Sequence, residues 1–83
     1  MQIPLFTLVS LLVDLPKYHL KAGDVATIVE YVGGNKGVPE GYVCETSNAV
    51  GETIAVFSVH ADQVSPLNKN EVFHVRTLGT RMK

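Results

Sequence analysis

The chain has 83 residues, of which 46% are hydrophobic and 18% are charged, and its formal net charge at neutral pH is −1. This length excludes a second domain, and a domain of this size buries only about 60–65% of the surface that its unfolded chain exposes. The single cysteine, Cys44, excludes an internal disulfide framework, and no apolar run reaches the roughly 18 residues of a membrane helix. We therefore expect one small domain, part of whose apolar surface meets another chain.

The N-terminal part of the chain predicts two strands joined by a turn. Residues 5–13 form an apolar run that ends at Asp14-Leu15-Pro16. No basic segment precedes this run and no small-residue cleavage site follows it, so we expect an unprocessed, cytoplasmic protein. Gly23 can adopt a positive φ and Asp24 can hydrogen-bond to its own backbone, so these two residues predict a tight structural turn. The β-branched run over residues 25–32 predicts the second strand.

The rest of the body predicts three more strands. A glycine-rich loop over residues 33–39 leads to a third strand at 42–47, a hairpin connection at 48–51 and a fourth strand at 53–59. Residues 60–63 predict a single helical turn, and residues 64–67 a short closing strand. Five short strands with one helical turn before the last favour an all-β fold, and specifically a small SH3-like barrel over residues 1–67.

Two of these strands are apolar on both faces. In the first, Phe6, Leu8 and Leu12 alternate with Leu5, Val9, Leu11 and Val13; in the fourth, Ile54 and Val56 alternate with Ala55, Phe57 and Val59. A strand face that does not reach the core needs other cover, so we expect self-association or contact with another small protein. Val56 and Phe57 are the candidate interface residues of the fourth strand. The alternative is that barrel twist and loops shield both faces.

The C-terminal extension, residues 68–83, differs from the body in charge. Residues 1–67 contain three lysines against seven acidic groups, a net charge of −4, whereas residues 68–83 contain four basic groups against one glutamate, a net charge of +3. Within this basic tail, residues 72–77 predict an added strand that pairs with a sheet edge through Val72, Phe73 and Val75, followed by disorder from residue 78. In the alternative function, the tail binds nucleic acid and its phosphate contacts are Lys69, Arg76, Arg81 and Lys83.

The sequence predicts no catalytic or metal site and no cofactor, so we do not expect an enzyme. His19, Cys44, His60 and His74 are scattered, without the spacing of metal ligands or of an acid–base pair. Cys44 lies in a strand pattern, where a small hydrophobic residue is the usual interpretation. For His60, we expect a contact with Asp62 that supports the helical turn.

The turn and strand at Lys21 to Val29 resemble the start of the KOW motif, which is found in nucleic-acid-binding SH3-like barrels. The later glycine spacing departs from that motif. In addition, the net charge of −4 on the body repels a polyanion, and few aromatic residues are present for base stacking. A KOW-like nucleic-acid-binding module is therefore the alternative, and a protein-interaction module is the main prediction.

Four segments together resemble a known family. Residues 11–16, 20–30, 51–56 and 62–64 are similar, in this order, to domain-of-unknown-function family 4926, which consists of small bacterial proteins with an SH3-like barrel. One departure is Ala26, where a glycine is common. The resemblance covers residues 6–67 and implies the fold, without an activity, a ligand or catalytic residues. Such proteins look like companions of other small proteins, which implies an antitoxin-like role or an accessory subunit.

Overall fold

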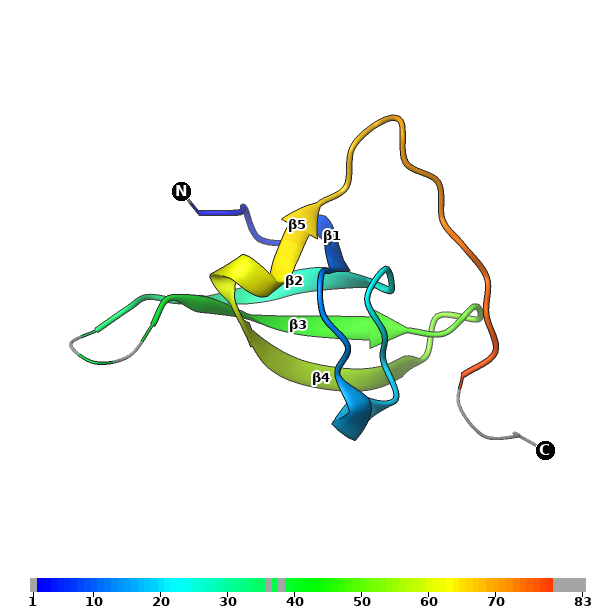
Figure 1. Ribbon diagram of the computed structural model, residues 1–83, viewed down its shortest axis with the longest axis horizontal. Coiled ribbons are helices and arrows are strands. Elements are labelled where there is room, and N and C mark those ends of the chain that lie inside the picture. Colours follow the sequence, from blue (N-terminus) through cyan, green and yellow to red (C-terminus); the bar gives the residue numbers. More distant parts are fainter. Residues whose placement is uncertain (1, 36, 38, 79–83) are drawn as a thin grey trace.

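The computed structural model describes residues 2–35, 37 and 39–78. Five strands form one antiparallel sheet in the order β4-β3-β2-β1-β5, which confirms the predicted all-β class (Figure 1). The strands are β1 (Leu8–Leu11), β2 (Val25–Val32), β3 (Gly41–Ser47), β4 (Thr53–His60) and β5 (Val64–Pro66). Two 3-10 turns, η1 (Pro16–Tyr18) and η2 (Ala61–Gln63), interrupt them, and η2 is the predicted helical turn before the last strand.

The long strands β2, β3 and β4 lie side by side, and the short strands β1 and β5 lie at a steep angle to them (Figure 1). Within the described residues no ladder joins β4 to β5, so the closure of an SH3-like barrel stays a prediction. The first strand is shorter than the predicted 5–13. Phe6 has a φ of 65°, which is incompatible with an extended strand, so β1 begins only after this residue.

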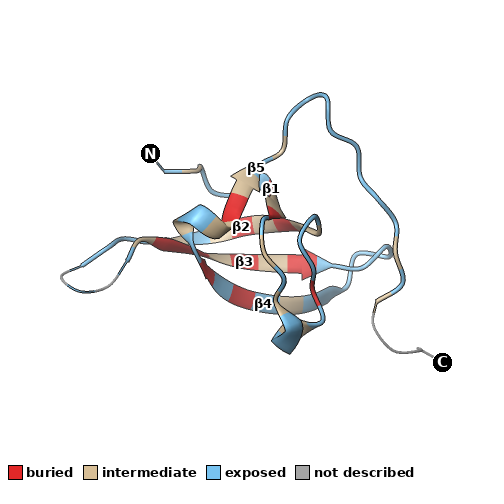
Figure 2. Ribbon diagram, viewed as in Figure 1, coloured by how far each residue is buried: buried red, intermediate tan, exposed pale blue. Residues whose placement is uncertain are grey.

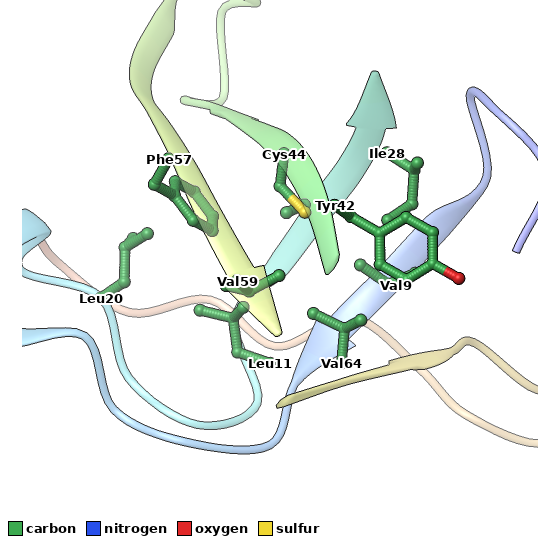
Figure 3. Close-up of a cluster of buried hydrophobic side chains, with 10 residues drawn as sticks. Val9, Leu11, Leu20, Ile28, Tyr42, Cys44, Phe57, Val59 and Val64 are labelled. Carbon is green, nitrogen blue, oxygen red and sulfur yellow. The ribbon is translucent and has the colours of Figure 1, made fainter. Parts of the chain in front are cut away.

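The core lies on one side of the sheet, where β1 to β4 contribute alternate side chains and β5 contributes Val64 (Figure 3). Figure 2 marks the buried positions along the ribbon. Its buried residues are Val9, Leu11, Leu20, Ala26, Ile28, Tyr42, Cys44, Phe57, Val59 and Val64. Tyr42 is only 1% exposed, and its hydroxyl oxygen accepts a hydrogen bond from the amide of Ile3 at 2.8 Å. A buried phenol needs such a partner, so this bond ties the N-terminal segment to the sheet.

The turn before β2 is built by Gly23 and Asp24. Gly23 has a φ of 96°, which residues with a side chain rarely adopt, and its amide donates to the carbonyl of Leu11 at 2.8 Å. The carboxylate of Asp24 accepts a hydrogen bond from the amide of Lys21 at 2.8 Å. These bonds fix the direction in which the chain enters β2, beside β1.

The tail does not form the strand predicted at residues 72–77: among the described residues, none of this segment pairs with the sheet. After β5 the chain makes a turn, in which the amide of Glu71 donates to the carbonyl of Asn68 at 3.0 Å. It then runs in a wide arc to the Gly23-Asp24 turn, where Arg76 binds Asp24 (Figure 1). This long-range contact holds the segment in place without strand pairing. Leu78 packs against the core instead of being disordered, and residues 79–83 lie outside the described part of the chain.

Gly41 allows β3 and β4 to approach closely, and we expect Gly41→Ala to destabilise the fold. A Cβ atom at this position would lie 2.4 Å from the carbonyl oxygen of Val59, a backbone atom that cannot move aside easily. Such overpacking costs about 1–3 kcal/mol in the free energy of unfolding, measurable as a lower urea midpoint. Gly33→Ala is the control, because its Cβ would meet only the Tyr31 ring, at 3.3 Å. Equal midpoints for the two variants would contradict the close contact.

Candidate interaction surface

The two faces of β4 differ sharply in exposure. Ile54 and Val56 point to solvent and are 40% and 56% exposed, whereas Phe57 is only 3% exposed. The centroid of the Phe57 ring lies 5.5 Å from that of Tyr18, within the core region. Phe57 was predicted as an interface residue, and the structure corrects this, because odd-numbered positions of β4 face inward. Val56 lies on the surface, as an interface residue must.

The two edges of the sheet are protected to different degrees. β5 has only three residues and ends at Pro66, which has no amide hydrogen to donate. Short edge strands and prolines are common devices against unwanted strand pairing. By contrast, β4 has eight residues, with the sequence TIAVFSVH, and contains neither a proline nor a lysine, arginine or acidic residue. Among the described residues, β4 is therefore the edge that remains open to another strand.

A second group of exposed apolar side chains belongs to the N-terminal segment and β1. Leu8 and Leu12 are 42% and 53% exposed, and Phe6 is 72% exposed. Val9 and Leu11, between them, are buried. The prediction that both faces of this region are apolar is therefore confirmed. One face packs into the core, and the face with Leu8 and Leu12 is exposed to solvent.

Two valines of the tail are the most exposed large apolar residues in the described part of the chain. Val72 and Val75 are both 90% exposed, and Phe73 is 67% exposed. The predicted interface residues of the tail thus lie on an extended segment that is attached to the body on either side, by the bond from the Leu67 amide to the Leu8 carbonyl and by Arg76. We call residues 72–75 the apolar strap.

The C-terminal attachment of the apolar strap is a bidentate ion pair. Arg76 Nε donates to Asp24 Oδ1 at 2.9 Å, and Nη2 donates to Asp24 Oδ2 and, at 3.0 Å, to the carbonyl of His19. Burial alone would raise the pKa of the Asp24 carboxyl. The hydrogen bonds from Arg76 and the Lys21 amide, together with the charges of Arg76 and Lys21, outweigh burial and hold this pKa below its ordinary value.

The predicted nucleic-acid contacts do not form a cluster in the described part of the chain. Lys69 is exposed, but Arg76 is half-buried and its charge is matched by Asp24. Arg81 and Lys83 lie outside the described residues. An open hollow of about 370 Å³ separates the tail from the loop after β1, and it is bordered by charges of both signs, Asp14 and Lys21 among them.

The candidate chemical groups are in separate elements. His19 follows η1, Cys44 lies in β3 and His60 ends β4. Cys44 is fully buried, and this burial raises the pKa of its thiol to about 11, so the reactive thiolate is rare at neutral pH. The amide of His60 donates to Gln63 Oε1 at 2.9 Å, so Gln63 supports the helical turn in the role expected for Asp62.

The described residues contain neither a metal-binding cluster nor a membrane-spanning helix. No three histidine, cysteine, aspartate or glutamate residues in residues 2–35, 37 and 39–78 gather into a group that could hold a metal ion. In the same residues, no helix has the length and hydropathy needed to cross a membrane.

Comparison with known proteins gives one match. A family model described as "Domain of unknown function (DUF4926)" matches residues 5–66. This range includes all five strands and ends where the tail begins. No curated protein and no solved structure matches the chain.

We expect acid to release the apolar strap, because the Asp24–Arg76 ion pair needs an ionised carboxylate. The pKa of Asp24 is lower in the folded protein than in the unfolded chain, so the contribution of this pair is fully present above the ordinary aspartate value of about 3.9. It is lost as the pH falls through the lower, folded value. Backbone ¹⁵N relaxation should then show faster motion in residues 72–78.

Arg76→Gln is the matched variant, since glutamine keeps a polar side chain but lacks the charge and the Nη2 donor that contacts Asp24 and the His19 carbonyl. It should show the same fast motion of the apolar strap already at neutral pH, with little further change in acid. An apolar strap that stays rigid in this variant would show that Arg76 does not anchor it.

Proposed function

Since the chain belongs to the DUF4926 family, whose description assigns no activity, we propose a function from the surface of the molecule itself. The domain is a protein-interaction module without catalytic activity, which associates with a second copy of itself or with another small protein. The observation that carries this proposal is Val56, which is 56% exposed in an uncharged edge strand.

The physical support is the cost of leaving apolar side chains in water. Removing apolar surface from water contributes about 25 cal/mol per Å², part of which offsets the entropy lost on association. Ile54 and Val56 lie near each other along β4, and the apolar strap adds Val72, Phe73 and Val75 as a second contact region. Because these contacts are apolar, the association should depend little on salt.

Two alternatives make different use of the molecule. An antitoxin-like role or an accessory subunit would use the same apolar surface, with a different small protein as its occupant. A KOW-like nucleic-acid-binding module would instead use the net charge of +3 on residues 68–83. This second alternative is weakened by the pairing of Arg76 with Asp24, which leaves fewer cations for phosphates.

Val56→Lys should weaken self-association, because the charged head group would have to be buried in the contact. Light scattering at low and high salt measures the effect as a shift from a larger assembly toward the monomer. Val50→Lys is the control: Val50 is 79% exposed, but it lies in the hairpin connection outside the strands. If Val56→Lys folds and associates like the wild type, the proposed surface is wrong.

Nucleic-acid binding is tested by neutralising the cations of the tail that do not hold Asp24. We expect the wild type to show no salt-dependent binding to a fluorescent single-stranded RNA in an anisotropy titration. The triple variant Lys69→Gln, Arg81→Gln, Lys83→Gln should therefore behave like the wild type. Binding by the wild type that falls steeply with salt and disappears in the variant would favour the nucleic-acid alternative.

A further inference from the structure

The hydrogen-bonding groups on the free edge of β4 can be identified from the β3–β4 register. In an antiparallel ladder, opposite residues alternate between pairs that exchange hydrogen bonds and pairs that do not. Gly41 is opposite His60, and in the next pair the amide of Ala61 donates to the carbonyl of Glu40 at 3.1 Å. The pair formed by Glu40 and Ala61 is therefore of the bonded type, and the Gly41–His60 pair is not.

Because bonded and non-bonded pairs alternate along the ladder, the register shows which main-chain groups of β4 point to β3 and which point away from it. The residues that bond to β3 are Val59, Phe57 and Ala55, and those whose amide and carbonyl point away from β3 are His60, Ser58 and Val56. The amide of His60 supports this assignment independently, because it donates to Gln63 Oε1 at 2.9 Å and not to β3. Val56 and Ser58 thus present their amide and carbonyl groups at the open edge.

The same stretch of β4 offers side-chain contacts to an incoming strand. Val56 and Ser58 are both exposed, and Ile54 extends the apolar surface on the same face. An incoming strand would gain main-chain hydrogen bonds from the edge and apolar contacts from this face. This combination is the physical basis of recognition by strand addition.

We infer that β4 pairs antiparallel with β4 of a second copy about a twofold axis, so that the two sheets become continuous. The inference rests on the proposed function and names its partner and its binding mode. β4 carries no lysine, arginine or acidic residue, so the strand meets its own copy without repulsion between like charges. Antiparallel pairing also places the Glu52 end of one β4 beside the His60 end of the other. The two Glu52 carboxylates therefore lie at opposite ends of the strand pair.

Face matching restricts the register of this pairing. Opposite residues in an antiparallel ladder lie on the same face, so the exposed even-numbered residues of one copy must meet those of the other. The central register sets Val56 opposite Val56 of the second copy. One strand pair buries less than the roughly 1,200–2,000 Å² of a standard interface, so the dimer should form in a concentration-dependent way.

Ser58→Pro tests the main-chain pairing directly. Proline removes the amide hydrogen that points to the open edge and spares the ladder with β3, and Phe57 before it is already extended. Ser58→Ala is the matched control. By sedimentation of the full chain over a concentration series, the alanine variant should dimerise like the wild type. The proline variant should show a dimer Kd at least about tenfold higher, since two symmetry-related hydrogen bonds are lost.

The two sets of variants separate the inference from the function on which it rests. If Val56→Lys dissociates while Ser58→Pro, with an unchanged circular dichroism spectrum, dimerises like the wild type, the apolar surface stands and the strand pairing is overturned. If both variants associate normally, both proposals fail. If Val72→Lys with Val75→Lys abolishes the dimer while Ser58→Pro dimerises like the wild type, the contact runs through the apolar strap, and the β4–β4 pairing is overturned.

If the proline variant does not fold, cross-linking tests the β4–β4 pairing instead. Val56→Cys should form a covalent dimer with a short bis-maleimide, because residue 56 faces the second copy near the twofold axis. Val50→Cys, at the exposed hairpin connection, should not, and the native Cys44 is fully buried and does not compete. No covalent dimer at position 56, or equal yields at both positions, would overturn the pairing.

Discussion

Side chains along β1 and β4 alternate between a closed core and open solvent, because a single curled sheet has one interior face. Among the described residues, no second layer covers the outer face. Leu8, Leu12, Ile54 and Val56 therefore remain exposed although their neighbours in sequence are buried. Both the stability of the domain and its capacity for contacts follow from this arrangement: the same strands supply the core and the surface.

The strand elements of this fold could be predicted well from local patterns, and their faces less well. β2 matches its predicted range, because a β-branched run after a Gly-Asp turn is a strong local signal. The ends of β1 were missed, since nothing in an apolar run reveals the positive φ of Phe6. In β4, a strand that is apolar on both faces gives no sign of which face is inside, and this is why Phe57 was assigned to the surface.

The tail shows a different limit of sequence reasoning. Its composition favours a strand, but its position is set by Arg76 and Asp24, which are 52 residues apart in the chain. No local pattern contains that ion pair, although the opposite net charges of body and tail are consistent with it. The open edge of β4 was likewise beyond reach from sequence, because the order of strands in the sheet decides which strand has one neighbour.

The burial of Cys44 has a consequence for how the motions of this domain can be followed. The thiol lies in β3 between its partners Ile28 and Phe57 on the neighbouring strands, so a reagent reaches it only when the sheet separates locally. The rate of thiol labelling is then the rate for a free cysteine multiplied by the fraction of molecules that are open. The protein's one cysteine is thus an internal reporter of the opening equilibrium of the sheet, at the centre of the fold and without any substitution.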